Sequence, residues 1–328
     1  MRIIFMGTPD FSVGTLEALC EAGHDVCLAV TQPDKPKGRG KEMQPTPVKE
    51  AAQKHGIPVF QPKRVREPEC VEELKKYNAD VIVVVAFGQI LPKTILELTP
   101  YGCINVHASL LPKYRGAAPI QWSIIEGEAV TGVTTMQMDE GLDTGDMLLK
   151  TEVPIAEDET GGSLHDKLSA AGAALCVETL AALENHTVSP QKQGDSPTAY
   201  AKMLDKKMGD IDWNDSARRI ERLVRALSPW PSAYTHWGDR VMKIWRAGAE
   251  PDEASAAAGK GEGAEPGKFA AAAAPGTVVA VGKDSFSVQT GDGILKVYEL
   301  QIPGKKRMET GAFLRGYAME RGTIFTRG

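Results

Sequence analysis

The sequence predicts an α/β fold, in which a doubly wound, mostly parallel sheet is followed by a small all-β domain. Apolar runs such as Asp80–Ala86 (DVIVVVA) and Cys103–His107 show little polar alternation, as expected for strands buried on both faces of a parallel sheet. Helical patterns separate such runs in the first 110 residues. After residue 208, short strand-like runs between turn signals favour a small β-barrel or sandwich.

Strands and helices alternate along the first part of the chain. The expected strands are Arg2–Met6, Asp25–Thr31, Pro58–Gln61, Asp80–Ala86, Cys103–His107, Val130–Met138 and Met147–Val153. The expected helices are Phe11–Ala22, Thr46–His55, Glu67–Tyr77, Pro92–Leu98 and the long Gly162–Leu183. Gly23 and Gly56 directly follow two of these helices, where glycine commonly ends a helix.

We divide the chain into a first domain (1–188), a polar linker (189–207) and a second domain (208–328). The second domain should contain a basic amphipathic helix and several short strands. The helix is expected at Ala217–Leu227. The strands are expected at Arg240–Trp245, Gly276–Val281, Ser285–Gln289 and Ile294–Leu300. Residues 247–275 are rich in Ala, Gly and Glu, and we expect a long flexible loop inserted between two strands.

The composition is that of a globular protein, with 42% apolar and 25% charged residues in 328. No apolar stretch approaches the roughly 20 residues that span a bilayer, and no leader pattern is present, so we expect a cytoplasmic protein. The net charge is −7 over residues 1–208 and +2 over residues 209–328. The less acidic carboxyl-terminal part is compatible with a polyanionic partner.

The five cysteines are odd in number and scattered. They are Cys20, Cys27, Cys70, Cys103 and Cys176. No CxxC pair or His–Cys cluster has the spacing of zinc ligands, so we expect reduced thiols and no metal.

The turn after the first strand, FMGTPDF, occupies the place of a dinucleotide-binding loop. It lacks the GxGxxG spacing, and Pro9 removes a backbone N–H that a phosphate would use. No GxxxxGK[ST] motif occurs in the chain. We therefore expect no nucleotide cofactor.

The most informative block is Gly102–Gln121 (GCINVHASLLPKYRGAAPIQ). Asn105 and His107 are two residues apart on an otherwise apolar strand, so their side chains share one face. They stand at the carboxyl end of that strand, where ligands bind in open α/β sheets.

A second block, Met138–Met147 (MDEGLDTGDM), places Asp143 between Gly141 and Gly145. Such a loop can bring a carboxylate against an imidazole, which favours the imidazolium form and fixes its orientation. Asn, His and Asp without a nucleophilic Ser or Cys suit acyl transfer to an amine that the substrate supplies. Asn105 and His107 would stabilise the oxyanion, and Asp143 would help to accept the amine proton. Taken singly, the histidine also fits a satisfied core residue and the aspartate a simple turn.

The run Asn105–Pro112 (NVHASLLP) and the GLDTGD loop together resemble the folate-dependent formyltransferases. The resemblance implies that Asn105, His107 and Asp143 form the catalytic set. It also implies that the turn bordering the pocket for 10-formyltetrahydrofolate is Ser109, Leu110, Leu111 and Pro112, with this folate as co-substrate.

The segment Thr31–Lys49 (TQPDKPKGRGKEMQPTPVK) is polar, basic and broken by prolines. Its composition fits a solvated surface loop, and equally a basic finger that touches phosphates. FMGTPDF and QPDKPKGRG are similar to motifs of methionyl-tRNA formyltransferases, and Ile211–Trp213 and Ser228–Pro231 match the start of that family's second domain. The resemblance covers about Arg2 to Gln301. It implies an initiator methionyl-tRNA acceptor and an oligonucleotide-binding-type second barrel.

We expect tRNA contacts from two parts of the chain. In the basic segment they are Lys35, Lys37, Arg39 and Lys41, with Arg39 matching an arginine that the family uses for tRNA discrimination. In the second domain they are Arg218, Arg222, Lys305 and Lys306, of which the first two share a helix face with Arg225. The arginine face equally fits a solvated stripe. We expect a monomer.

Two other functions stay open. One is a formyltransferase of the same fold that acts on a small amine such as a sugar nucleotide, which would lack the basic loop. The other is an RNA-binding module with a decayed active site, against which the intact Asn105, His107 and Asp143 argue. The 247–275 insert is longer than expected for the family.

Overall fold

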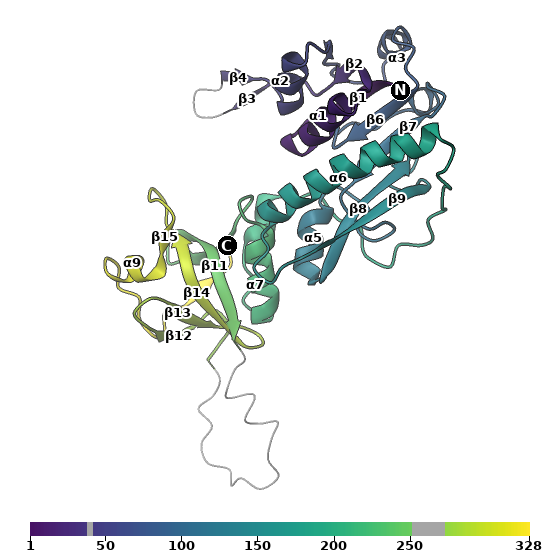
Figure 1. Ribbon diagram of the computed structural model, residues 1–328. Helices are drawn as coiled ribbons and strands as arrows, with labels where there is room; N and C mark the ends of the chain where they lie inside the picture. The colour runs from purple at the N-terminus through teal and green to yellow at the C-terminus, as the bar shows by residue number, and fades with distance from the viewer. Residues whose placement is uncertain (38–41, 251–272) are drawn as a thin grey trace, which may run out of the picture. The chain divides into compact units, whose positions relative to one another are not determined.

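The computed structural model describes residues 1–37, 42–250 and 273–328, and the chain forms two compact units (Figure 1). The first unit contains Met1–Ile120, Ala129–Ile155 and Ser163–Lys202. The second unit contains Gln121–Glu128, Ala156–Gly162 and Met203–Gly328.

The first unit is built on a seven-stranded sheet with the order β5-β2-β1-β6-β7-β8-β9. Its strands are β1 (Arg2–Gly7), β2 (Asp25–Val30), β5 (Val59–Phe60), β6 (Val81–Val85), β7 (Cys103–His107), β8 (Val130–Gln137) and β9 (Met147–Pro154). Neighbours from β5 through β7 run parallel, whereas β8 and β9 are antiparallel. Strands β6 and β7 are buried along their whole length, as their continuous apolar runs predict. The predicted mostly parallel sheet is confirmed.

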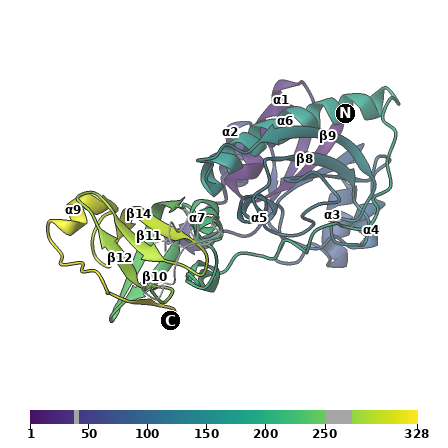
Figure 2. The same ribbon diagram turned by 90° about the horizontal axis from the view of Figure 1, so that it is seen from below.

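Helices cover both faces of this sheet (Figure 2). They are α1 (Val13–Glu21), α2 (Pro47–Lys54), α3 (Pro68–Lys75), α4 (Lys93–Leu96) and α6 (Gly161–Glu184), with a 3-10 turn at Asp10–Ser12. The α3 residues Val71 and Leu74 pack with Ile82 and Val84 of β6 on one face. On the other face, Gly172 of α6 lies against Val106 of β7. Helix α5 (Pro119–Glu126), most of which belongs to the second unit, was not predicted from the sequence.

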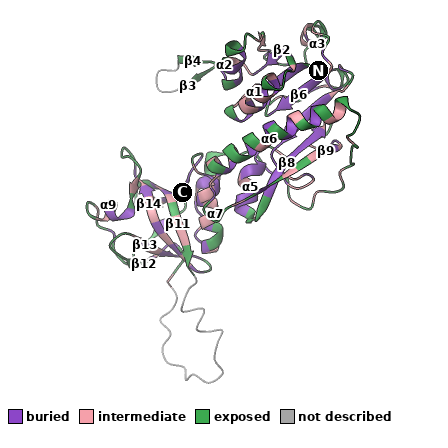
Figure 3. Ribbon diagram, viewed as in Figure 1, coloured by how far each residue is buried: buried purple, intermediate pink, exposed green. Residues whose placement is uncertain are grey.

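Local signals explain where these helices begin. The Thr46 side chain accepts a hydrogen bond from the Lys49 N–H, and Pro47 occupies the first turn of α2. In the second unit, the Ser216 side chain caps α7 (Ala217–Ala226) by accepting from the Arg219 N–H. Figure 3 shows the resulting burial, with buried residues concentrated along the sheet strands.

The second unit is a curled antiparallel sheet with the order β12-β13-β14-β11-β10-β16, and β15 pairs with β14. The strands are β10 (Ala233–Trp237), β11 (Arg240–Glu250), β12 (Val278–Val281), β13 (Phe286–Gln289), β14 (Ile294–Gln301), β15 (Met308–Glu309) and β16 (Phe325–Thr326), with α9 (Thr310–Leu314) and a 3-10 turn at Lys206–Gly209. Its two edges meet, because the Val278 N–H donates to Thr323 O and the Phe325 N–H donates to Gly276 O, each at 2.8 Å. The sheet therefore curls into a small barrel-like domain, as predicted.

One predicted boundary is wrong. Ala247–Glu250, which the sequence assigned to the insert, continue β11 and pair with β14, Ala247 opposite Val297 and Glu250 opposite Ile294. Backbone pairing needs no particular side chain, so an Ala- and Gly-rich composition does not mark the end of the strand. Residues 251–272 of the insert lie outside the described residues.

The basic segment contains a short antiparallel hairpin, β3 (Lys35–Lys37) and β4 (Glu42–Gln44), where the sequence indicated only an irregular loop. Strand β4 is exposed along its length. A strand with no buried face has no apolar alternation to mark it in the sequence.

Candidate active site

Asn105 and His107 lie at the carboxyl end of β7, as the sequence predicts. Cys103, two residues before Asn105, packs in the cluster that α3 and α4 cover, and Val106 faces α6 on the other side. Asn105 and His107 alternate with Val106 and therefore face the α3 and α4 side of the sheet. Both are almost enclosed, with 9% and 6% of their surface exposed.

The two nitrogens of the His107 ring face different protein groups. Its Nε2 lies 3.1 Å from the Tyr114 carbonyl oxygen. Because a carbonyl oxygen only accepts, Nε2 is the donor and carries a proton in either charge state of the ring. The other nitrogen, Nδ1, lies 3.7 Å from Asp143 Oδ1, which is too far for a direct hydrogen bond. Among the described residues, Nδ1 is therefore the ring nitrogen without a direct hydrogen bond to the protein.

Asp143 is anchored in the loop between β8 and β9. Its Oδ2 accepts a hydrogen bond of 2.9 Å from the Gly116 N–H, which leaves Oδ1 facing His107. Asp143 has a left-handed backbone (φ +56°), a conformation that non-glycine residues adopt only where the surroundings hold them. Gly145 is required for the close packing of this loop, since a Cβ there would lie 1.8 Å from Gln137 O.

Asn105 is enclosed but free to bind a ligand. Among the described residues, its side-chain amide makes no hydrogen bond to another protein group. The amide is not among the fully buried polar atoms without a partner, so solvent, and hence a ligand, can reach it. An unpaired amide beside His107 is therefore suited to donate to a substrate oxygen.

Thr134, a residue not singled out from the sequence, holds the turn predicted to border the folate pocket. Thr134 Oγ1 on β8 donates to Ser109 O at 2.7 Å and accepts from the Leu111 N–H at 3.1 Å. The Ser109 hydroxyl donates to Lys113 O and is fully buried, so it supports the turn from inside. Leu111 is also buried, whereas Leu110 and Pro112 keep partly exposed surface. Only these last two present side-chain surface to a ligand.

An exposed apolar side chain follows the neighbouring strand β6. Ile90 is 77% exposed in the loop after β6, which pairs with β7 through Val84 and Asn105. The loops after adjacent parallel strands meet at one edge of the sheet. The sequence indicates where this loop begins, because the apolar run VIVVVA is followed by FGQILP, which contains a glycine and a proline.

Of the four predicted phosphate contacts in the basic segment, Lys35 and Lys37 lie on β3. Lys35 is exposed, and Arg39 and Lys41 lie outside the described residues. The hairpin is anchored at its base by Asp34, whose carboxylate accepts from Gln61 Nε2 at 2.7 Å and from Lys49 Nζ at 2.6 Å. These hydrogen bonds, first that of Gln61 and then that of Lys49, lower the pKa of Asp34 below its usual value.

Replacing Asp34 by Asn should destabilise the protein at neutral pH but not in acid. A lowered folded-state pKa contributes stability that is present above the unfolded pKa, about 3.9, and is lost as pH falls through the folded value. Urea unfolding of both proteins between pH 7 and pH 3 should therefore give midpoints that converge below about pH 3.9. A difference that stays constant to pH 3 would show that this carboxylate is not stabilised by its neighbours.

The cations predicted to contact tRNA from the second unit differ in their exposure and in their contacts with other protein groups. Arg218 on α7, Lys305 and Lys306 are exposed. The Arg222 guanidinium packs against Gly127, where a Cβ would lie 2.0 Å from its Cζ. Arg225, on the same predicted face, pairs with Glu221 and donates to Glu159 O at 2.7 Å. The arginine stripe is therefore only partly available to a partner.

A second group of cations lies over two aromatic rings, Trp245 of β11 and Tyr298 of β14. The Arg307 guanidinium and the Lys243 ammonium lie 5.0 and 5.6 Å from the Trp245 ring centroid. Arg246 and Lys296 lie 5.2 and 5.9 Å from that of Tyr298. Cations over aromatic faces occur on surfaces that bind single-stranded nucleic acid. Here, however, Arg307, Arg246 and Lys296 also pair with Glu299, Glu309 and Glu250, respectively, which neutralises much of their charge. Along β11 the side chains alternate: Met242 and Ile244 point inward, whereas Lys243 and Trp245 point outward. This alternation is visible in the sequence.

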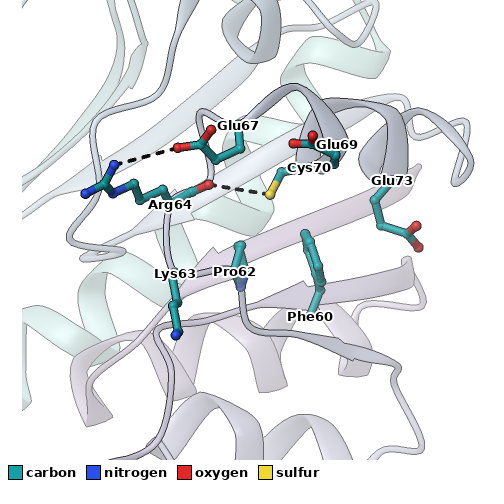
Figure 4. Close-up of a pocket in the computed structure, with 8 residues that line it drawn as sticks. All are labelled: Phe60, Pro62, Lys63, Arg64, Glu67, Glu69, Cys70 and Glu73. Atoms are coloured by element: carbon teal, nitrogen blue, oxygen red, sulfur yellow. Dashed lines mark hydrogen bonds and ion pairs between the residues drawn. The ribbon is translucent and has the colours of Figure 1, made fainter.

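A surface depression elsewhere in the first unit does not coincide with this site (Figure 4). It lies beside β5 and α3 and is lined by Phe60, Pro62, Lys63, Arg64, Glu67, Glu69, Cys70 and Glu73. None of the predicted site residues lines it, and its charges of both signs favour no single ligand. Within residues 1–37, 42–250 and 273–328, no helix is long and apolar enough to span a membrane, and no group of three or more His, Cys, Asp or Glu could hold a metal.

Comparison with known proteins identifies both units. The family model described as "Formyl transferase" matches residues 1–180, and "Formyl transferase, C-terminal domain" matches residues 203–318. A methionyl-tRNA formyltransferase of Agathobacter rectalis is 57% identical over 99% of this chain and 100% of its own.

Two solved structures share the fold. An N-formyltransferase from Helicobacter canadensis, in complex with folinic acid and dTDP-3-aminofucose, matches with a TM-score of 0.64 at 18% identity, over 90% of this chain and 98% of its own. HypX from Aquifex aeolicus, in complex with tetrahydrofolic acid, matches with a TM-score of 0.58 at 17% identity, over all of this chain and 51% of its own. Given the full-length relative and both family matches, the chain belongs to the methionyl-tRNA formyltransferases.

Proposed function

We propose that the protein transfers the formyl group of 10-formyltetrahydrofolate to the α-amino group of methionyl-tRNA, giving N-formylmethionyl-tRNA. The observation that carries the site assignment is the enclosed, unpaired Asn105 amide beside a His107 that faces Asp143. These three groups can stabilise an oxyanion and move a proton without a covalent enzyme intermediate.

In the proposed reaction His107 moves a proton and leaves oxyanion stabilisation to Asn105, because its Nε2 donor is already bound to the Tyr114 carbonyl. The acceptor amine attacks the formyl carbon, a new C–N bond forms, and the carbonyl oxygen gains negative charge. The Asn105 amide donates to that oxygen, and one such donor lowers the barrier by about 3 kcal/mol. The Nδ1 and Asp143 pair takes the proton that the amine loses and returns it to the folate nitrogen as the old C–N bond breaks. The Tyr114 carbonyl holds the ring by Nε2 throughout.

The 3.7 Å gap between Nδ1 and Asp143 Oδ1 has to shorten for this proton transfer. Catalytic contacts are often long without substrate and tighten when it binds. The folate co-substrate would sit against the exposed surface of Leu110 and Pro112. Apolar surface with a few polar groups is typical of pockets for flat ring systems, and the HypX structure with tetrahydrofolic acid shows this fold with such a ligand.

The tRNA would be held by the hairpin and by the second unit. Lys35, Lys37, Arg39 and Lys41 would contact phosphates at the acceptor end. Arg218, Arg222, Lys305 and Lys306 would contact it from the second unit, together with the cations over Trp245 and Tyr298. Local patches have to supply this attraction, because the first 208 residues carry a net charge of −7.

Replacing Arg39 by Ala should raise the KM for methionyl-tRNA by about 10-fold or more and leave the KM for 10-formyltetrahydrofolate unchanged, because a lost charge-assisted hydrogen bond costs about 1.5–3 kcal/mol. The matched control is Lys54→Ala, which removes the same charge from an exposed position at the end of α2. Steady-state kinetics with each substrate varied in turn measure both constants. Equal effects on the two would contradict a tRNA-binding hairpin.

The acceptor itself is tested by comparing two candidate substrates. Methionyl-tRNA and a nucleotide-linked amino sugar are supplied separately with 10-formyltetrahydrofolate, and the formylated product is quantified. We expect formylation of methionyl-tRNA alone. Formylation of the amino sugar at a higher kcat/KM would instead support an enzyme for small amines.

A further inference from the structure

The polar segment that the sequence assigned to a linker is fastened to the first unit. Gln191 and Met147 exchange two backbone hydrogen bonds of 2.8 Å, so the segment pairs with the start of β9. Farther on, Ala201 accepts from the Ala117 N–H and donates to Arg115 O, each at 2.8 Å. Figure 1 shows the coil leaving α6 and passing β9. We refer to residues 191–201 as the strap.

The strap contacts both loops that hold His107. One is the loop of Tyr114, whose N–H donates to Thr198 Oγ1 at 2.7 Å. The other is the loop of Asp143, which Gln193 reaches: its Nε2 donates to Asp143 O at 2.9 Å and to Gly145 O at 2.7 Å. The single Gln193 amide therefore uses both of its N–H groups on the loop that carries the carboxylate.

Arg115 binds the oxygen of the Gln193 side-chain amide. Gln193 Oε1 accepts from Arg115 Nε at 3.0 Å and from Nη2 at 2.8 Å, and Nη2 also donates to Gly194 O at 2.8 Å. An amide whose oxygen and nitrogen are both engaged cannot flip or swing away. Arg115 is the neighbour of Tyr114 and of Gly116, whose N–H binds Asp143 Oδ2. Gln193 thus joins the two loops directly.

From this geometry we propose that Gln193 is a positioning residue, which with Arg115 holds the Asp143 loop so that Oδ1 faces His107 Nδ1. The inference rests on the catalytic role of Asp143 given under Proposed function. The left-handed backbone of Asp143 needs such support, because a non-glycine residue keeps that conformation only when its neighbours hold it. The bond from Gln193 to the Asp143 carbonyl supplies it.

Two variants separate the parts of this contact. Gln193→Ala removes the whole amide. Gln193→Glu keeps an oxygen for Arg115 but loses both donors to the Asp143 loop. Both should lower kcat by about 10- to 100-fold with little change in either KM, since a misplacement of about 1 Å in a catalytic group costs rate on that scale. Gln191→Ala is the matched control, because its side chain is exposed and its strap contact is made by backbone.

A double-mutant cycle with Asp143→Asn gives the decisive readout. If Gln193 acts through Asp143, adding Gln193→Ala to Asp143→Asn should lower single-turnover rates by less than about 3-fold, because coupled residues are not additive. A full 10- to 100-fold loss in that background, or wild-type kcat for both Gln193 variants, would overturn the proposal. Near wild-type turnover of Asp143→Asn alone would instead overturn the proposed catalytic set.

Discussion

Replacing His107 by Ala should lower turnover by about 10²–10⁴-fold, the usual contribution of a positioned acid–base group. In this site the ring is the group that faces Asp143 across 3.7 Å and has its other nitrogen fixed by Tyr114 O. Without it, the proton from the amine has no relay beside the carboxylate. Rates of formyl-methionyl-tRNA formation measure this loss, and folate binding should persist because the Leu110 and Pro112 surfaces remain.

A matched variant separates catalysis from folding. His107→Ala removes the hydrogen bond from the ring to the Tyr114 carbonyl, whereas His107→Gln can still make that bond but cannot exchange a proton at neutral pH. We expect both variants to be equally inactive and His107→Gln to keep a near wild-type Tm. A turnover within a few-fold of wild type for either variant would end the mechanism proposed for this residue.

Replacing Asn105 by Asp should lower kcat by about 10²–10³-fold, the cost of losing one oxyanion donor. The substitution keeps the shape of the side chain and removes only its N–H donors. It also places a carboxylate where negative charge develops, so the loss should equal or exceed that of Asn105→Ala. Single-turnover rates at saturating substrates isolate this step, and binding of the folate measured separately is the control. A rate for Asn105→Asp above that for Asn105→Ala would contradict the oxyanion role.

The parts of the site that follow from side-chain pattern were predictable. Alternation along β7 places Asn105 and His107 on one face, and flanking glycines mark Asp143 as a loop residue. The contacts that complete the site were not predictable, because backbone groups such as Tyr114 O and the Gly116 N–H leave no signal in a sequence. Their positions depend on how a distant loop packs.

The strap and the barrel surface show the same limit. A polar run without periodicity predicts a linker, and only the tertiary pairing of Gln191 with Met147 shows that it lies on the first unit. Trp245 fits a core residue by type, yet it lies on the outer face of β11, with Arg307 5.0 Å from its ring centroid. The sequence alone thus placed Asn105, His107 and Asp143 correctly on their strand and loop, but it did not reveal the contacts that support them.

The central claim is formyl transfer to methionyl-tRNA at Asn105, His107 and Asp143. The most direct measurement supplies the protein with 10-formyltetrahydrofolate labelled in its formyl carbon and a pool of charged tRNAs, and then identifies which aminoacyl-tRNA carries the label. The account predicts label on methionyl-tRNA, abolished in the His107→Gln variant. Label spread evenly over all aminoacyl-tRNAs, no label on methionyl-tRNA, or unchanged labelling by His107→Gln would contradict it.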